Sequence, residues 1–455
     1  MNFTLLSSSL KVTELTFNLV SRLVRMVSLK NLCTMLEKSG AINLHTRKNR
    51  QQSIYVVVTY VMFILYICGH FFSTVTRSIR YEPEFVQMIA DDALYLMILL
   101  SINNYRAEYR LLGKLLYMES SFSKACHGII KKCEREANLI FKFSLGAVFC
   151  ANVEKIFKAL LPIPSAELEI RRYVYRTENA HRRHPSNVRI LFMDESKSYT
   201  YEIIYLFQSW IFVLLIVWIT VVITFIPVLV VHMRGQYKIL AKYIEKIGEV
   251  HRDPLGNAIM YTNIETDEYV VLKLKKIDGK TDRRIQMREM REKRELQNEY
   301  QRRYLIQIFK FHKRILMYQD QCVKLLSPIV LSLVMGHTII FTLGLCQLVL
   351  SRTELSPQRL FTFISEFVAE AFAYFILCNC SEIANDCNLI LCKAINTCSW
   401  TNCSSQTRRD ISILLRRVQQ PNHLRFYSGA LILSRAYFLK VLKVAYTFLN
   451  FVLNV

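Results

Sequence analysis

Seven long apolar runs constrain this chain more than any other feature. They lie at about 53–76, 84–104, 138–162, 202–233, 323–350, 358–383 and 430–453. About twenty apolar residues in a helix cross the roughly 30 Å hydrocarbon layer of a bilayer, and a helix satisfies its own backbone hydrogen bonds there. The runs therefore predict an all-α, polytopic membrane protein with seven transmembrane helices.

The basic residues between these runs predict how the chain is oriented. With the N-terminus inside, the inside segments 1–52, 105–137, 234–322 and 384–429 hold 8, 7, 20 and 6 Lys plus Arg, and the outside segments 77–83, 164–200 and 351–357 hold 2, 7 and 1. Basic residues collect on the cytoplasmic side of membrane proteins. We therefore expect a cytoplasmic N-terminus and an external C-terminus. The net charge of +23 then reflects topology, and no nucleic-acid partner is expected.

This topology predicts six segments along the chain. They are a cytoplasmic N-terminal segment (1–52), transmembrane helices one to four (53–233), a long cytoplasmic loop with a helical anchor region (234–322), helices five and six (323–383), a cytoplasmic helix and connection (384–429), and a pore-lining final helix (430–455). The first fifty residues contain no signal-peptide pattern. Because the chain ends within an apolar helix, no cytoplasmic tail is expected to signal.

The long inside segment divides further. Residues 235–250 continue the fourth helix, 252–282 are expected to form a loop, and 283–322 return as a charged helix. Apolar helix faces below a bilayer need a partner, so residues 235–250 and 300–322 are expected to hold most of the contact between subunits, with Leu305, Ile308 and Ile315 among them.

The chain carries no pattern typical of an enzyme or a metalloprotein. It has no phosphate-binding glycine loop, no His-Glu-x-x-His and no nucleophile–base constellation, so no catalytic activity or cofactor is expected. The 13 cysteines include a cluster from Cys378 to Cys403 without a Cys-x-x-Cys pair, which argues against zinc. No cysteine falls in 164–200, so no external disulfide framework is indicated.

Ionisable residues inside the apolar runs are candidates for function. Asp91 and Asp92 lie in the second run, His337 in the fifth, and Glu366 and Glu370 share one face of the sixth. Alternatively, these residues pair within the bundle with Lys155, Lys158 or backbone groups.

The fourth run contributes a group of aromatic residues. They would either form an aromatic ligand cage or pack in the core, and the sequence leaves both readings open; they are Tyr205, Phe207, Trp210, Phe212 and Trp218.

The final helix has a second notable pattern. Leu442, Tyr446, Leu449 and Leu453 are spaced 4, 3 and 4, which puts them on one stripe, and Asn450 interrupts the apolar run. Symmetry-related copies of this stripe could close a pore by dewetting. The stripe could equally be a helix-packing seam.

Three motifs in the last third of the chain resemble the insect odorant receptors. They are FKFHKRILMYQDQ at the start of the fifth span, CNCSEIANDCNLILCKAINTCSW after the sixth, and RRDISILLRRVQQP followed by FYSGALILSRAYFLKVLKVAYTF at the close. The resemblance is specific over about 305–450. One departure is Arg425-Phe426-Tyr427, where family members read Gly-Lys-Phe.

The resemblance implies a ligand-gated, non-selective cation channel. Such a subunit forms a heterotetramer with the common odorant coreceptor in the plasma membrane of olfactory sensory neuron dendrites, surrounded by membrane lipid, and binds a small volatile ligand. The family's gate falls near Leu449 and Leu453 here, with Tyr446 and Asn450 beside them. Its pocket lies among helices two, three, four and six in the outer half of the membrane. The positions expected to line it are Asp92, Tyr95, Phe149, Phe157, Tyr205, Gln208 and Phe212.

Other receptor and transport classes fit the residues less well. Gustatory receptors end in Thr-Tyr, five residues, then Gln-Phe, whereas this chain has Ala445-Tyr446 and Val452-Leu453. The closing sequence of the coreceptor is absent. A G-protein-coupled receptor would carry Asn-Pro-x-x-Tyr in its last helix, and a transporter would show repeated halves and broken helices.

Overall fold

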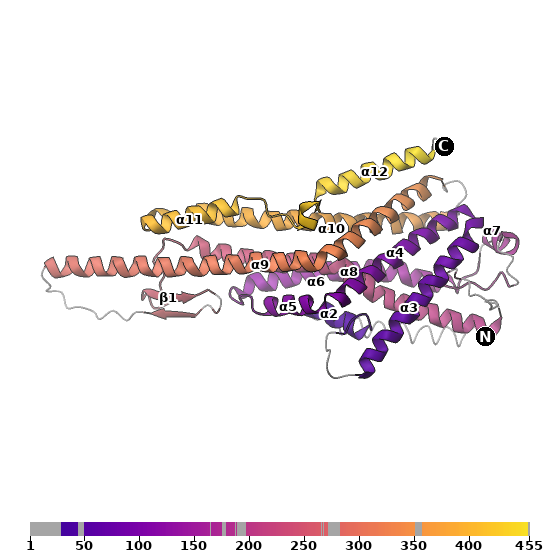
Figure 1. Ribbon diagram of the computed structural model, residues 1–455, viewed down its shortest axis with the longest axis horizontal. Helices are drawn as coiled ribbons and strands as arrows, with labels where there is room; N and C mark the ends of the chain where they lie inside the picture. The colour runs from indigo at the N-terminus through magenta and orange to yellow at the C-terminus, as the bar shows by residue number, and fades with distance from the viewer. Residues whose placement is uncertain are drawn as a thin grey trace.

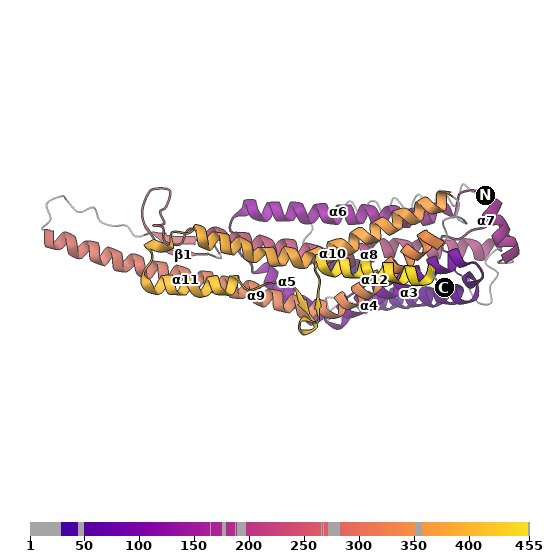
Figure 2. The same ribbon diagram turned by 90° about the horizontal axis from the view of Figure 1, so that it is seen from above.

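The computed structural model describes residues 29–43, 50–163, 165–174, 179–186, 188, 197–264, 266, 268–271, 283–350 and 357–453. Residues 1–28 of the predicted N-terminal segment lie outside these ranges. The molecule is elongated, with long helices running mostly along its length (Figure 1, Figure 2). One end carries α11 (Ser405–Val418) and the other α7 (Ser165–Glu169), and we name the two ends after these helices.

Most of each predicted apolar run lies in one long helix, although the runs at 138–162 and 430–453 extend beyond theirs, so the predicted helical membrane architecture is confirmed. The helices are α3 (Arg50–Thr76), α4 (Glu82–Ala107), α6 (His127–Lys158), α8 (Ser198–Glu245), α9 (Arg283–Leu350), α10 (Pro357–Thr397) and α12 (Arg435–Leu453). Shorter helices at the edges of the bundle are α2 (Leu29–Lys38) and α5 (Tyr109–Ser120).

Among the described residues, five of these helices are long and apolar enough to cross a membrane. They are α3, α4, α8, α9 and α10. The apolar run of α6 contains Lys142, Glu154 and Lys155, which make this helix more polar. The description of α12 ends at Leu453.

Helix α8 forms the centre of the core. It is apolar around its whole circumference, and 83% of its most apolar stretch is buried. Such a helix must be surrounded by others, and α2, α6, α9 and α10 all pack against it. The indole of Trp218 is fully buried and donates a hydrogen bond to Ser39 Oγ at 2.9 Å, which ties α2 to the centre of the bundle.

Two small antiparallel sheets add to the helical fold. Strands β1 (Ile259–Asn263) and β2 (Glu268–Val271) pair within 252–282, so the prediction of a loop there is wrong for these residues. Strands β3 (Arg425–Phe426) and β4 (Leu431–Ile432) form the second sheet.

The second sheet delays the start of the final helix. We predicted that this helix begins near residue 430, but α12 starts at Arg435. Gly429 has φ +97°, a backbone angle that favours glycine and interrupts a helix. The hydroxyl of Ser434 then accepts a hydrogen bond from the Tyr437 N–H at 3.1 Å and caps the new helix.

Three helices extend further than their apolar runs. Helix α8 continues past its apolar run as predicted but ends at Glu245 instead of residue 250. Helix α9 is one helix of 68 residues, and α10 continues to Thr397 instead of ending near residue 383. These extensions pack on one another toward the α11 end (Figure 1).

The extended part of α9 corrects one prediction. Leu305, Ile308 and Ile315 are 2%, 0% and 0% exposed within the single chain. Their apolar face is covered inside the subunit, so these residues are not available for contacts between subunits.

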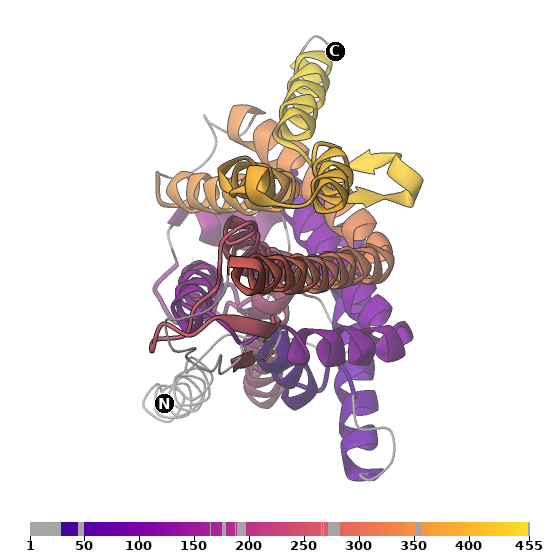
Figure 3. The same ribbon diagram turned by 90° about the vertical axis from the view of Figure 1, so that its left-hand side faces the viewer.

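Helix α12 lies at the periphery. Seen end-on, it projects from one edge of the bundle, while the extended part of α9 runs through the middle (Figure 3). Among the long helices of the described chain, α12 packs extensively against α9 and α10 only.

Candidate ligand-binding site

A cavity of about 650 Å³ lies between the long helices, in the part of the bundle toward the α7 end. Helices α4, α6, α9 and α10 form its walls, and Ile219 and Ile223 of α8 contribute on the inner side. Most of the surface is apolar or aromatic, including Phe143, Val148 and Phe367. A cavity of this size and lining is suited to a small, mainly apolar molecule.

One part of the wall is charged. Lys155 Nζ of α6 lies 3.1 Å from Asp91 Oδ1 of α4 and 3.8 Å from Glu366 Oε1 of α10. All three side chains are between 21% and 29% exposed, and all three line the cavity. One ammonium group therefore joins three helices across the cavity wall.

A second polar pair lines the cavity on the side of α9. His337 Nδ1 lies 2.5 Å from Glu370 Oε1 of α10. The His337 ring stacks on Tyr374, with 5.2 Å between ring centroids and 17° between planes. Tyr374 in turn meets the edge of Phe438 of α12 at 5.9 Å. The cavity wall is thus in continuous contact with α12.

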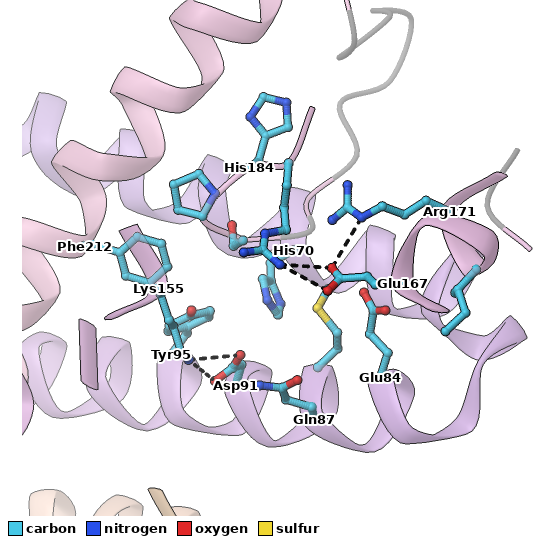
Figure 4. Close-up of a pocket in the computed structure, with 15 residues that line it drawn as sticks. His70, Glu84, Gln87, Asp91, Tyr95, Lys155, Glu167, Arg171, His184 and Phe212 are labelled. Atoms are coloured by element: carbon cyan, nitrogen blue, oxygen red, sulfur yellow. Dashed lines mark hydrogen bonds and ion pairs between the residues drawn. The ribbon is translucent and has the colours of Figure 1, made fainter. Parts of the chain in front are cut away.

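A smaller pocket of about 110 Å³ adjoins the cavity toward the α7 end (Figure 4). Gln87, Asp91, Tyr95 and Lys155 line both spaces, so they form a shared wall. The rest of its lining is strongly polar.

Residues near α7 close this smaller pocket. The Glu167 carboxylate accepts hydrogen bonds from Arg171 Nε at 3.4 Å and from Arg183 Nη1 at 3.1 Å (Figure 4). Burial lowers the pKa of the Arg171 guanidinium, and Glu167 opposes this effect. Ser186 N–H donates to Gln208 Oε1 of α8 at 3.0 Å and fixes the segment against the bundle.

The predicted ligand-binding residues are distributed over both spaces and the core. Tyr95 lines the cavity and the smaller pocket, and Phe212 lines only the smaller pocket. Asp92 lines neither and instead contacts His70 and Thr74 of α3.

The remaining four predicted residues lie outside the lining of both spaces. Gln208 and Tyr205 are buried, with Gln208 bonded to Ser186 and the Tyr205 hydroxyl 3.4 Å from the Ile156 carbonyl. Phe149 packs partly buried against the core, and Phe157 is 39% exposed.

The aromatic residues of α8 mainly pack in the core. Trp218 meets the edge of Phe63 at 4.9 Å between centroids, and Phe207 and Trp210 are near each other at 6.4 Å. Of the five, Phe212 lines the smaller pocket and the other four line neither of the two spaces described, which favours the core-packing alternative for those four.

The ionisable residues singled out in the sequence converge in space. The structure pairs Asp91 and Glu366 with Lys155, as the alternative reading expected, and pairs Glu370 with His337. The side chain of Lys158 lies outside the described residues. The sequence signal for this part of the cavity wall was the position of these ionisable residues inside apolar runs. The apolar lining from α6 and α10 had no such signal, because it does not differ from ordinary packing residues.

The stripe on α12 is divided between two environments. Tyr446 is 60% exposed, whereas Leu449 is 6% exposed and lies with Val441 and Ala445 on the buried face. Asn450 is intermediate, and the side chain of Leu453 lies outside the described residues.

No group of His, Cys, Asp and Glu suited to a metal ion occurs among the described residues. The cysteines described are all free thiols.

Comparisons with known proteins bear on the fold and the family. A family model described as 7tm Odorant receptor matches residues 86–446. The chain is similar to the structure of the insect olfactory receptor OR5 from Machilis hrabei, with TM-score 0.65 and 14% identity over 93% of this chain and 97% of that one. It is also similar to the structure of that receptor in complex with eugenol, with TM-score 0.65 and 13% identity over 94% and 97% of the two chains. A search of curated protein sequences gives no match.

Proposed function

Since this chain belongs to the 7tm odorant receptor family, we propose that it is a subunit of an odorant-gated, non-selective cation channel. The observation that supports this most is the apolar cavity of about 650 Å³, whose wall is in contact with α12 through Tyr374 and Phe438. A ligand in the cavity would touch the same helices that hold α12 in place.

The ligand in this proposal is a small volatile molecule. The Machilis receptor was solved with eugenol, a small volatile compound, and the two chains share a fold. In this chain, the cavity combines aromatic walls with the Lys155 and His337 pairs, so an odorant with a polar group and an apolar body would match it.

We propose that the α7 end is external and the α11 end cytoplasmic. The extensions of α8, α9 and α10 beyond their apolar runs all point toward the α11 end, and those of α8 and α9 are rich in Lys and Arg. Basic segments of this kind favour the cytoplasmic side. The cavity then lies in the outer half of the membrane.

The pore in this proposal is lined by α12 from four subunits. Its peripheral position and the exposed Tyr446 are consistent with a face that meets other subunits. Leu453, Asn450 and Leu449 would complete the narrow part of the pore, although Leu449 lies on the buried face of α12 within the single subunit. The partner subunits are the odorant coreceptor, in the plasma membrane of olfactory sensory neuron dendrites.

Current recordings test the proposal. Cells expressing the chain together with an odorant coreceptor are exposed to a panel of volatile compounds, and cells expressing the coreceptor alone serve as the control. We expect an inward cation current with at least one compound only when this chain is present. A response that requires a G protein, or none that depends on this chain, would contradict the proposal.

A further inference from the structure

The smaller pocket contains a buried polar group that the proposed function does not use. The His70 side chain of α3 is 0% exposed and lines this pocket (Figure 4). Its Nδ1 lies 2.6 Å from Asp92 Oδ1, and Thr74 Oγ1 lies 2.7 Å from Asp92 Oδ2. Asp92 therefore holds the imidazole in a fixed orientation from behind.

This arrangement determines which ring nitrogen of His70 remains available as an acceptor. A carboxylate only accepts hydrogen bonds, so the proton between His70 and Asp92 belongs to Nδ1. In a neutral imidazole the lone pair then lies on Nε2. Tyr95 meets the ring edge-on at 5.1 Å and 87°, which further restricts its rotation.

The Nε2 atom has no hydrogen-bond partner anywhere in the described chain, although it is buried. A buried acceptor without a partner is unfavourable, and a donor that reaches it recovers that free energy. The pocket beside it has about 110 Å³, less than the roughly 150 Å³ cavity that admits benzene. It has room for the polar end of an odorant rather than for a whole one.

We propose that His70 Nε2 accepts a hydrogen bond from the hydroxyl group of an alcohol. The hydroxyl end enters the smaller pocket beside Tyr95, and the carbon chain lies in the larger cavity across the shared wall. Ethers and ketones present only lone pairs, which repel the lone pair of Nε2, so the site distinguishes donors from acceptors of similar size. This inference rests on the proposed function, because it names the class of odorant that the receptor takes.

Two substitutions separate the roles of the two ring nitrogens. In His70→Asn the side-chain amide can replace Nδ1 at Asp92, but no acceptor remains at the position of Nε2. In His70→Gln the longer side chain can place its carbonyl oxygen near that position. Each variant is expressed with the coreceptor, its surface level is measured, and currents are recorded with hexanol, octanol and the methyl ethers of both.

We expect the wild type to respond to the alcohols at lower concentration than to the ethers. His70→Asn should raise the half-maximal concentration for the alcohols about tenfold and leave that for the ethers unchanged. His70→Gln should retain part of the preference for alcohols.

Other outcomes would overturn the inference. An equal change for alcohols and ethers would mean that His70 only supports the fold or holds water. If His70→Asn loses only its response to the ethers, Nε2 carries a proton and acts as a donor. If the wild type responds to other odorants but not to the alcohols, alcohols are not its ligands. Absence of any odorant current from the wild type is a different failure, that of the proposed function itself.

Discussion

The charged residues of the cavity wall act as links between helices. Lys155 contacts Asp91 and Glu366, so α6 is joined to α4 and α10 at one point. Removing one partner from a poorly solvated pair leaves the other charge uncompensated, which costs more than the pair itself contributes. The pairs therefore hold the cavity together even where they add little net stability.

Lys155→Met tests this role. We expect it to lower the free energy of unfolding by about 1–3 kcal/mol, because two carboxylates lose their cation. The double variant Lys155→Met/Asp91→Asn should be more stable than Lys155→Met alone. Denaturation of these two variants, of Asp91→Asn alone and of the wild type in detergent gives the coupling energy. Purely additive effects would contradict the ion pair.

Glu119 of α5, which lies outside the membrane-spanning helices, should make the stability of the folded protein depend on pH. Burial raises the pKa of its carboxyl group to about 7, from 4.5 for an ordinary Glu. The folded protein therefore holds this proton more tightly than the unfolded chain, and stability is lost as the pH rises from about 4.5 to about 7.

We expect Glu119→Gln to remove this dependence. Between pH 5 and pH 8 its melting temperature should fall by roughly 2–5 °C less than that of the wild type, and the two proteins should melt alike at pH 5. Glu108→Gln, at an exposed carboxyl on the residue before α5, serves as the control. Parallel pH curves for wild type and Glu119→Gln would refute this assignment.

The sequence identified the charged residues of the cavity wall better than it identified the apolar residues that line the cavity. Asp91, Glu366 and His337 stood out because ionisable groups are rare in apolar runs, and they do meet at one cavity. Lys155 was among their expected partners, whereas the pairing of His337 with Glu370 depends on a distance in space that spacing along the chain does not reveal. Phe149 and Phe143 look alike in sequence, yet only Phe143 lines the cavity, because the rotation of α6 decides which face turns inward.

Among the elements, α10 connects the cavity with α12. It carries Glu366 and Glu370 in the cavity wall, and one turn further Tyr374 and Phe375 contact Phe438 of α12. Arg435 at the start of α12 is bonded to Asn379 Oδ1 at 2.8 Å. A small shift of α10 on ligand binding would therefore move α12.

A polar substitution in α12 tests the proposed gate. Leu453→Ser should raise the current in the absence of odorant, because a polar side chain lets an apolar constriction fill with water. The double variant with Leu449→Ser should leak more. Phe448→Ser, at an exposed position about 100° from Leu449, is the control and should leak less. Equal leakage at all positions would make this stripe a packing seam.

The end of α8 offers a test of packing at the α11 end. Gly248 has φ +84°, and a Cβ atom there would lie 2.0 Å from the Ser399 carbonyl oxygen. Gly256 has φ +82° with open space around it. We expect Gly248→Ala to cost more than 2 kcal/mol of stability and Gly256→Ala about 1 kcal/mol. Similar losses in thermal denaturation would show that the contact with Ser399 is unimportant.

Element boundaries were harder to predict than elements. The apolar runs located all seven long helices, since twenty apolar residues have few alternatives. The 425–432 hairpin was missed because its turn depends on left-handed Tyr427 and Ser428, residue types that give no such signal. The extension of α10 to Thr397 was missed because polar residues there are compatible with both helix and loop.

At the scale of the whole molecule, the single chain leaves apolar surface uncovered toward the α11 end. Leu389 of α10 and Ile413 of α11 are 63% and 56% exposed, in a region proposed to be cytoplasmic. Our sequence-based prediction placed subunit contacts on α9 residues that are in fact buried. The periodicity of α9 identified its apolar face correctly, but the sequence did not show that other parts of the same chain cover it.

The function we propose requires that a ligand in the 650 Å³ cavity opens a cation conductance. Ala151 of α6 lines this cavity, whereas its neighbour Cys150 is exposed and does not. Ala151→Phe should fill the space, and Cys150→Phe should add the same ring outside it. The decisive measurement is the concentration dependence of odorant-evoked current for these two variants and the wild type, each expressed with the coreceptor at matched surface levels. We predict that Ala151→Phe raises the half-maximal concentration at least about tenfold, or abolishes the response, while Cys150→Phe behaves like the wild type. Equal responses from all three proteins would contradict the proposal that the odorant acts by binding in this cavity.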